Sequence, residues 1–381
     1  MFDERLRQKL ALQKKQGLYR RPPITEACDG RTVTVCGRRL INFASNDYLG
    51  LGRSACLGKK LGAAFEKCGS SSSSSRLVSG NAVLIREAEK AYASYFGHDD
   101  ALFFPSGYQA NLALLSTLFG RDETLFFDKH VHASTVKGMQ LGASAIRSFK
   151  HNSMNHLDRR LKGASGTKVV VTESLFSMDG DMAPFSVLGQ MKKEHGLLLV
   201  VDEAHAFGAL GNGGRGLAQG VADVALGTFG KAMGLFGAFV LLPSLYREYL
   251  LNFASPFIYT TALPAAHAQG ALCVLEAIQR ADEARARLAA LSQTLKDDLK
   301  ARGFEVRGDA HILAIEIGSE ERAQRLVASL FEAGFFAFTA RFPTVPLGQA
   351  IVRVSLTTHL TFKDISAFAE TLSRLSAELP S

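Results

Sequence analysis

The sequence has no long, uninterrupted apolar run of the kind that crosses a membrane. Its most apolar stretch, residues 221–242, contains Asp223, Lys231 and four glycines, which favours buried strands and turns over a membrane span. Residues 1–17 are highly charged and follow a helical pattern, unlike a secretory signal. We therefore expect a cytoplasmic protein with no membrane partner.

Cysteine is also scarce. The five cysteines are odd in number and irregularly spaced, and no CxxC pair occurs. This usage indicates free thiols in a reducing compartment, and it argues against a disulfide framework or a metal site. The five residues are Cys28, Cys36, Cys56, Cys68 and Cys273.

A clustered basic face is missing, although the net charge is +8. The positive residues are scattered apart from short groups such as Lys14-Lys15 and Arg20-Arg21, so we expect no nucleic-acid partner. Attraction of an anionic small substrate and a solvated basic surface explain the charge equally well. With 381 residues and 47% hydrophobic content, the chain is typical of a globular protein of two or three domains.

The periodicity divides the chain into three parts. Residues 1–44 predict an arm with a helix over 3–17 and a hairpin over 32–43. In 45–280, apolar runs alternate with helical patterns, which indicates a large α/β domain with a mostly parallel sheet. A strong amphipathic helix over 281–302 then opens a small C-terminal α+β domain, 281–381. The clearest apolar runs of the large domain are 101–104, 124–127, 168–171, 197–201 and 237–242.

Two segments suggest one particular chemistry. Asp202 follows the apolar run 197–201, and ligands collect at the carboxyl ends of strands in open α/β sheets. Lys231 stands alone among apolar residues and glycines in 226–234; burial would lower its pKa and make it a Schiff-base nucleophile. The P-loop alternative fails because the GxxxxGK[ST] spacing is absent. A Schiff-base lysine and an aspartate for the pyridinium nitrogen are what pyridoxal phosphate (PLP) requires.

A phosphate site is also expected. Ser106, Gly107 and Tyr108 follow an apolar strand and begin a helix, where backbone N–H groups bind phosphate well. Two more segments that follow apolar runs, 129–134 with His132 and 173–181 with Ser177, suit the same pocket. Each of these signals taken alone is as consistent with a structural role. The serine-rich stretch 70–75 is read as an ordered loop near the site, with a flexible loop as the alternative.

With these residues in place, the chain resembles the α-oxoamine synthases, a group of fold-type I PLP enzymes. The matching motifs occur in order and span residues 42–359. They include NFASNDYLGL (42–51), RLVSGN (76–81), FPSGYQANLALL (104–115), HASTVKG (132–138), HNSMNHL (151–157), TESLFSMDGDMAPF (172–185), VDEAHAFGALGNGGRG (201–216), GTFGKAMG (227–234), FIYTTALP (257–264) and PTVPLGQAIVRVSLTTH (343–359).

The resemblance implies roles for individual residues. Lys231 would hold the cofactor and act as acid and base. Asp202 would pair with the pyridine nitrogen, His132 would stack on the ring, and His205 with Ser177 would contact the phenolic oxygen. The remaining cofactor-binding residues would be Ser106, Gly107, Tyr108, Thr228, Thr260 and Thr261, the last two reaching the neighbouring subunit's phosphate in a homodimer with shared active sites.

The substrate side is implied in the same way. Asn46 and Arg353 would bind the amino-acid carboxylate, for which the arginine fork is well suited. Ser79, Arg20 and Arg21 are further candidates, the two arginines for the distal end of an acyl chain or for a surface role.

The motif sequences are most similar to those of the α-oxoamine synthases that condense L-alanine with a pimeloyl thioester in biotin synthesis. The thioester is carried on coenzyme A or on acyl carrier protein. Sibling activities with glycine and acetyl-CoA, glycine and succinyl-CoA, or serine and a long acyl chain stay open. The serines after Gly69, Pro105, and Leu235-Phe236 depart from the usual pattern and bear on the acyl substrate. A non-catalytic partner subunit would lack the lysine, whereas Lys231 is present.

Overall fold

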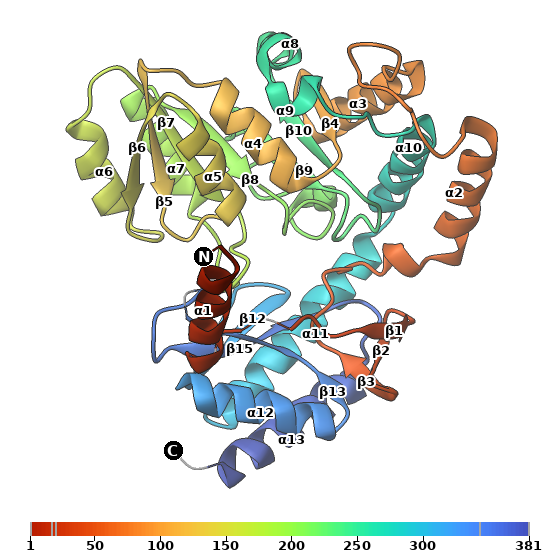
Figure 1. The fold of residues 1–381 in the computed structure, drawn as a ribbon, viewed down its shortest axis with the longest axis vertical. Coiled ribbons are helices and arrows are strands. Elements are labelled where there is room, and N and C mark those ends of the chain that lie inside the picture. Colours follow the sequence, from red (N-terminus) through yellow and green to blue (C-terminus); the bar gives the residue numbers. More distant parts are fainter. Residues whose placement is uncertain (1, 17, 20, 343, 380–381) are drawn as a thin grey trace.

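The computed structural model describes residues 2–16, 18–19, 21–342 and 344–379. Two lobes stack along the long axis of the molecule (Figure 1). The larger lobe is built around a seven-stranded sheet, and the smaller lobe contains about the last quarter of the chain. The long helix α11 (Asp282–Ala301) begins where the large lobe ends, close to the predicted helix over 281–302.

The large sheet has the order β4-β10-β9-β8-β7-β5-β6. All neighbours pair in parallel except β10, which runs antiparallel to both β4 and β9. The strand β10 follows β9 after a short loop, and a parallel return would need a crossover of roughly a dozen residues. The strands are β4 (Asp100–Phe104), β5 (Glu123–Asp128), β6 (Ala145–Phe149), β7 (Thr167–Glu173), β8 (Leu198–Asp202), β9 (Val224–Thr228) and β10 (Ala238–Leu242).

Helices cover both faces of this sheet because its strands are apolar on both sides. Successive strand residues face opposite ways: Leu102 joins one core cluster and Phe103 another, and Val200 and Val201 divide in the same manner. The arrangement confirms the predicted α/β class with a mostly parallel sheet. The helices of this lobe are α2 (Ala55–Cys68), α3 (Val83–Phe96), α4 (Gly107–Thr117), α5 (Ala133–Leu141), α6 (Met154–Lys162), α7 (Phe185–His195), α8 (Ser244–Phe253), α9 (Ser255–Ile258) and α10 (Ala265–Gln279), with the short 3-10 turns η1 (Leu51–Arg53) and η2 (Asn212–Gly214).

The small lobe is an antiparallel sheet with helices packed against it. Its strand order is β11-β12-β15-β14, and α13 begins with a capping box in which Thr361 and Asp364 satisfy each other's backbone N–H groups, a strong helix-start signal. The elements are β11 (Val306–Arg307), β12 (Ile312–Gly318), β14 (Phe338–Ala340), β15 (Ala350–Ser355), α12 (Glu320–Glu332) and α13 (Phe362–Glu378).

The N-terminal hairpin is attached to the small lobe. Strands β1 (Thr25–Cys28), β2 (Thr32–Val35) and β3 (Arg38–Asn42) form a sheet that β13 (Phe335–Phe336) completes in parallel with β3. Arg31 Nε and Nη2 also donate to the buried carboxylate of Asp364, at 2.9 and 2.6 Å. The division into parts at residues 44 and 280 stays a prediction, but the hairpin contacts the last part of the chain.

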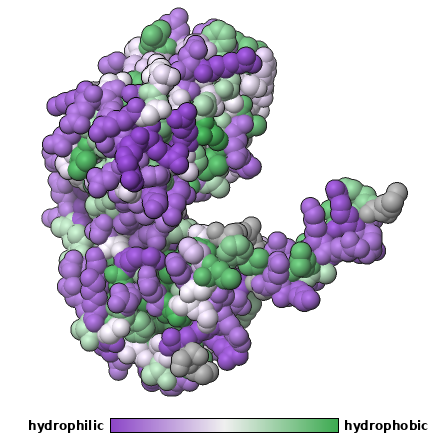
Figure 2. Space-filling view, turned by 90° about the vertical axis from the view of Figure 1, so that its left-hand side faces the viewer, coloured by the Kyte–Doolittle hydropathy of each residue, from purple (hydrophilic) through white to green (hydrophobic). Residues whose placement is uncertain are grey.

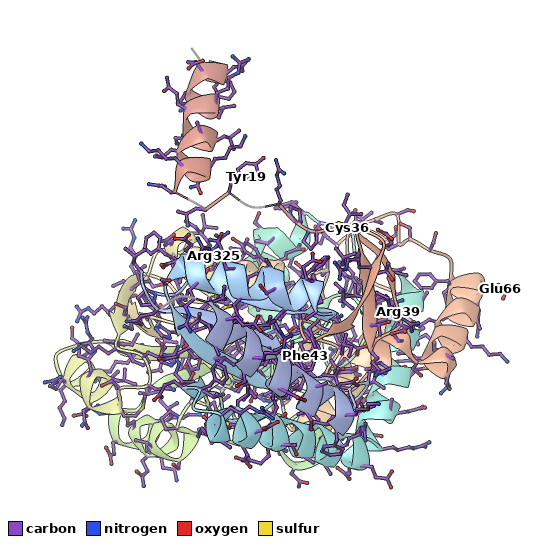
Figure 3. All side chains as sticks on the ribbon, turned by 90° about the horizontal axis from the view of Figure 1, so that it is seen from below. Tyr19, Cys36, Arg39, Phe43, Glu66 and Arg325 are labelled. Carbon is purple, nitrogen blue, oxygen red and sulfur yellow. The ribbon has the colours of Figure 1, made fainter. Side chains whose placement is uncertain are left out.

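The first helix stands away from both lobes. Helix α1 (Phe2–Lys15), predicted over 3–17, has no buried residue. Figure 2 shows it as an arm that projects from the body, and Figure 3 places Tyr19 between the helix and the hairpin that carries Cys36 and Arg39. Within the described ranges, no helix is both long and apolar enough to cross a membrane.

Candidate active site

A cavity of about 210 Å³ lies where the parallel strands of the large sheet end. The loops after β5, β7, β8 and β9 meet there, as expected for ligand sites of open α/β sheets. Eight of the predicted site residues line this cavity: Gly107, Tyr108, His132, Ser177, Asp202, His205, Thr228 and Lys231. Five further residues complete the lining, namely Asn111, Ser134, Glu173, Ala204 and Leu226.

Lys231 is half-buried in the loop between β9 and β10. Burial lowers the pKa of its ammonium group from 10.5 to about 8, and the attraction of Asp202 and Glu173 only partly opposes this effect. The side chain also lines a second, more open cavity of about 510 Å³, so its exposed part faces a cavity. A lowered pKa leaves a usable fraction of free amine near neutral pH, the form that attacks a carbonyl group.

A chain of hydrogen bonds holds Asp202 and His132 in relation to each other. Asn111 Nδ2 donates to Asp202 Oδ2 and to Ser134 Oγ, each at 3.0 Å. Ser134 Oγ in turn lies 2.7 Å from His132 Nδ1. The carboxylate at the end of β8 and the imidazole at the start of α5 are therefore fixed by two residues that were not predicted as site residues.

Glu173, the last residue of β7, is a fully buried acid beside the lysine. Burial raises its pKa to about 8, and the nearby charge of Asp202 acts in the same direction. Glu173 Oε1 accepts a hydrogen bond from the backbone N–H of His132 at 2.5 Å, and the backbone of Ser177 also donates to this carboxyl group. Glu173 thus joins the two segments that carry His132 and Ser177.

His205 is buried next to the cavity and is held by an aromatic partner. Its Nδ1 lies 2.5 Å from Tyr48 Oη, and Tyr48 packs against His311 with ring centroids 3.9 Å apart. Burial lowers the pKa of His205 well below its usual value, and the charges of Lys231 and Arg353 add to the effect. His205 is therefore a neutral hydrogen-bonding group at physiological pH.

The two predicted carboxylate-binding residues come together behind this histidine. Arg353 on β15 is buried; its Nε donates to Ser177 O at 2.6 Å and its Nη1 to Ser355 Oγ at 2.6 Å. Ser355 Oγ lies 3.4 Å from Asn46 Oδ1, which also accepts from Tyr48 Oη at 3.1 Å. The small lobe thus contributes a buried cation that contacts Ser177, one of the residues lining the cavity.

The N-terminus of α4 opens into the same cavity. Ser106 caps this helix, its side chain accepting from Gln109 N at 3.2 Å, and Gly107 and Tyr108 form the first turn. First-turn N–H groups and the helix dipole favour a phosphate there. An amine of lowered pKa, a carboxylate at a strand end and a helix N-terminus around one cavity make a donor set that fits PLP.

Several predicted residues lie outside this cavity in the single chain. Ser79 and Thr261 are exposed, Thr260 borders a separate small cavity, and Arg21 stacks over Tyr19 on the N-terminal arm at 5.8 Å. Their roles stay predictions, as does the placement of Ser70–Ser75 near the site. That loop is ordered against 261–262, with Ser72 Oγ donating to Ala262 O at 2.8 Å. Arg20 lies outside the described residues.

Comparison with known proteins places these observations in a family. Residues 38–372 match the family model for aminotransferase class I and II. The 8-amino-7-oxononanoate synthase of Chlorobaculum parvum is 38% identical, and the match covers 97% of each chain. A structure of SPT, serine palmitoyltransferase, with PLP is 30% identical with a TM-score of 0.92, covering 98% of this chain and 97% of that one. The 8-amino-7-oxononanoate synthase of Francisella tularensis is 32% identical with a TM-score of 0.77, covering 88% and 97%.

These matches agree with the cavity geometry and with the resemblance seen in the motifs. The family match extends over most of the chain, and the structural match includes both lobes. The chain belongs to the aminotransferase class I and II family of fold-type I, PLP-dependent enzymes.

Proposed function

We propose that the protein is a PLP-dependent acyltransferase that condenses L-alanine with a pimeloyl thioester, releasing the carrier thiol and carbon dioxide and giving 8-amino-7-oxononanoate. The observation that carries the proposal is the convergence of Lys231, Asp202 and His132 on one cavity beside the N-terminus of α4. The similarity to a named 8-amino-7-oxononanoate synthase over nearly the whole chain supports the substrate assignment.

PLP, when bound, supplies an electron sink for negative charge at the amino-acid α-carbon. Asp202, oriented by Asn111, would keep a proton on the pyridine nitrogen. The first turn of α4 would bind the phosphate. His132 would pack on the ring face, its orientation fixed by Ser134.

The proton transfers fall to Lys231. Its lowered pKa provides a free amine that can take the α-proton and return it after carbon dioxide has left, and a base is most effective when its pKa lies near the working pH. Arg353 would hold the amino-acid carboxylate through its planar fork, with Asn46 beside it through Ser355. His205, held by Tyr48, would contact the phenolic oxygen of the ring.

The acyl thioester would arrive through a second cavity that Lys231 also lines. The second cavity shares Lys231 with the first and is lined by Ser45, Asp47, Arg53 and Phe236 among others. Lys231 therefore lines both the cofactor cavity and a more open cavity. Arg53 gives that approach a cation for an anionic carrier such as coenzyme A, and acyl carrier protein is the other carrier to test.

The assignment is tested by amino-acid titration of the PLP-loaded protein. We expect L-alanine to change the visible absorption spectrum at lower concentration than glycine or L-serine, and pimeloyl-CoA then to yield the aminoketone. A preference for glycine or serine would contradict the substrate assignment while leaving the chemistry of Lys231 in place. Comparing kcat/KM for the CoA and carrier-protein thioesters decides the carrier.

A sibling synthase is the second candidate, and one observation favours it. Structures of serine palmitoyltransferase match both lobes with TM-scores of 0.92, higher than the value of 0.77 for an 8-amino-7-oxononanoate synthase. The titration with L-serine tests this candidate directly.

A further inference from the structure

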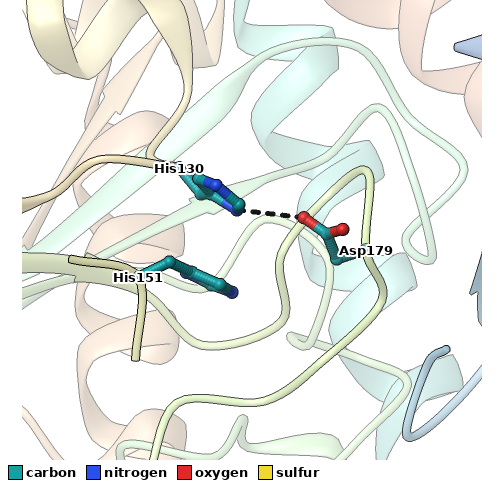
Figure 4. A group of neighbouring side chains, drawn as sticks. All are labelled: His130, His151 and Asp179. Carbon is teal, nitrogen blue, oxygen red and sulfur yellow. Dashed lines mark hydrogen bonds and ion pairs between the residues drawn. The ribbon is translucent and has the colours of Figure 1, made fainter. Parts of the chain in front are cut away.

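His130, His151 and Asp179 belong to a cluster of histidines and aspartates and do not line the cavity; Figure 4 shows these three side chains. The His151 ring is held at both nitrogens: Nδ1 lies 2.9 Å from Asp128 Oδ1, and Nε2 lies 2.7 Å from Asp181 Oδ2. Beside it, His130 Nδ1 lies 3.0 Å from Asp179 Oδ2. Carboxylates only accept hydrogen bonds at neutral pH, so both nitrogens of His151 must carry a proton.

His130, His151 and Asp179 bring potential metal ligands within 4.8 Å of one another, but their geometry does not suit an ion. The two imidazole rings are stacked, with centroids 4.0 Å apart and planes inclined by only 14°. A metal binds in the plane of each imidazole at about 2 Å from the nitrogen, and one ion cannot lie in two stacked planes. Both nitrogens of His151 are moreover already engaged.

The cluster instead connects two segments that border the cavity. The His132 segment (128–132) runs from β5 to α5, and the Ser177 segment (176–182) follows β7. Asp128, fully buried, belongs to the first and also accepts from the backbone of His130 at 2.8 Å. Asp181 belongs to the second, so His151, which does not line the cofactor cavity, bridges the two segments.

Neighbouring contacts make this bridge specific. Asn152, next to His151, donates its side-chain amide to Asp181 Oδ2 at 2.6 Å, and its backbone N–H donates to Asp128 Oδ2 at 2.8 Å. Hydrogen bonds to Asp128 and Asp181 outweigh the effect of burial and raise the pKa of His151 to about 9. On the cavity side, Glu173 receives backbone hydrogen bonds from both segments. The two segments are thus held together through His151, through Glu173 and through the direct contact between His130 and Asp179.

We propose that His151 is a positioning residue that keeps the His132 and Ser177 segments at the correct separation around the cofactor ring. The inference rests on the proposed contacts of His132 and Ser177 with PLP. Because ring contacts require placement to a fraction of an ångström, loosening the bridge weakens cofactor binding without removing any group that touches the cofactor.

The test compares His151→Gln, Asp181→Asn and a matched control, His156→Gln. Glutamine cannot carry the charge or donate to both carboxylates in the histidine geometry. His156 is a nearby histidine on α6 whose Nδ1 accepts from Lys150 N at 3.0 Å. We expect His151→Gln to raise the PLP dissociation constant about tenfold, which is the effect of losing a supporting residue around a metal site. The variant should also shift the pH midpoint of the bound cofactor's absorbance. Asp181→Asn should change both in the same direction, and His156→Gln neither.

Wild-type affinity and an unchanged pH midpoint in both His151→Gln and Asp181→Asn would overturn the proposal, even if their melting temperatures fall. If His151→Gln does not fold, Asp181→Asn decides, because it retains the contact between His151 and Asp128. Binding of one equivalent of Zn²⁺ to the wild type but not to His151→Gln would also overturn it, in favour of a metal site. The measurements use PLP alone, so a wrong substrate assignment does not affect them.

Discussion

Lys231 is the residue on which the proposed chemistry depends. We expect Lys231→Ala to lose the absorbance of lysine-bound PLP and to reduce turnover by about three orders of magnitude or more, as removal of a catalytic nucleophile commonly does. Lys137→Ala is the matched control, because Lys137 is exposed on α5 and its ammonium group donates to Gln140 Oε1 at 3.0 Å. Full activity of Lys231→Ala in a steady-state assay would disprove the assignment.

The lowered pKa of Lys231 has a measurable consequence for loading of the cofactor. Only the unprotonated amine attacks the PLP aldehyde. With a pKa of about 8, the rate at which the PLP-free protein captures PLP should rise about tenfold from pH 6 to 7 and level off above pH 8. Stopped-flow absorbance gives this profile. A rate still rising tenfold per unit at pH 9 would mean that the lysine keeps its ordinary pKa of 10.5.

Single residues also show where sequence reasoning ends. Lys231 and Asp202 could be predicted because a lone lysine among glycines and an acid at a strand end are local patterns. Glu173, Asn111 and Ser134 were missed as site residues although all three lie within recognised motifs, because their partners are 23 to 91 residues away in the chain. For Glu173 and Asn111 the available signal was a polar residue next to apolar ones, whereas Ser134 lies in the polar first turn of α5 and gave no such signal.

At the scale of elements, the turn between Ser177 and Asp181 depends on Gly180. Its φ is +70°, and an added Cβ would lie 2.1 Å from the carbonyl oxygen of Ile312 in the small lobe. We expect Gly180→Ala to destabilise the protein by about 3 kcal/mol or more, through left-handed strain of about 1 kcal/mol plus the backbone clash. Gly196→Ala isolates the strain, because Gly196 has φ +58° and no atom within 4 Å of an added Cβ.

Urea unfolding of the two variants separates these terms. Gly196→Ala should lose about 1 kcal/mol of unfolding free energy. An equal loss in both variants would show that the two lobes do not meet closely at this turn.

The elements themselves were predictable to different degrees. The buried strands and the helix over 281–302 follow from local periodicity, and their positions agree within a few residues. Strand direction does not follow from local periodicity. The apolar run 237–242 resembles those of the parallel strands, yet β10 is antiparallel because the loop that joins it to β9 is short. The run 335–340 also divides between two sheets, since β13 pairs with the hairpin and β14 with β15. Pairing is set by tertiary packing, which periodicity does not encode.

At the scale of the whole molecule, we predict that a partner copy covers an exposed apolar patch. Leu77, Val78 and Tyr259 are 70%, 79% and 81% exposed, and their loops are joined by the bridge between Ser75 and Thr261. Clustered apolar exposure of this kind marks an interface. The patch contains the segments that the family resemblance assigns to a homodimer with shared active sites, including Thr260 and Thr261.

A charge placed in this patch tests the dimer and the shared site together. We expect the wild type to have twice the chain mass of 41.1 kDa by light scattering, and Val78→Asp to shift it toward the monomer, because an unpaired carboxylate is costly to bury. Leu141→Asp is the control, since Leu141 is also exposed, at 68%, but lies at the end of α5. If Thr260 or Thr261 completes the partner's phosphate site, Val78→Asp also loses PLP affinity as it dissociates. A Val78→Asp monomer with wild-type PLP affinity would show instead that each chain forms its cofactor site alone.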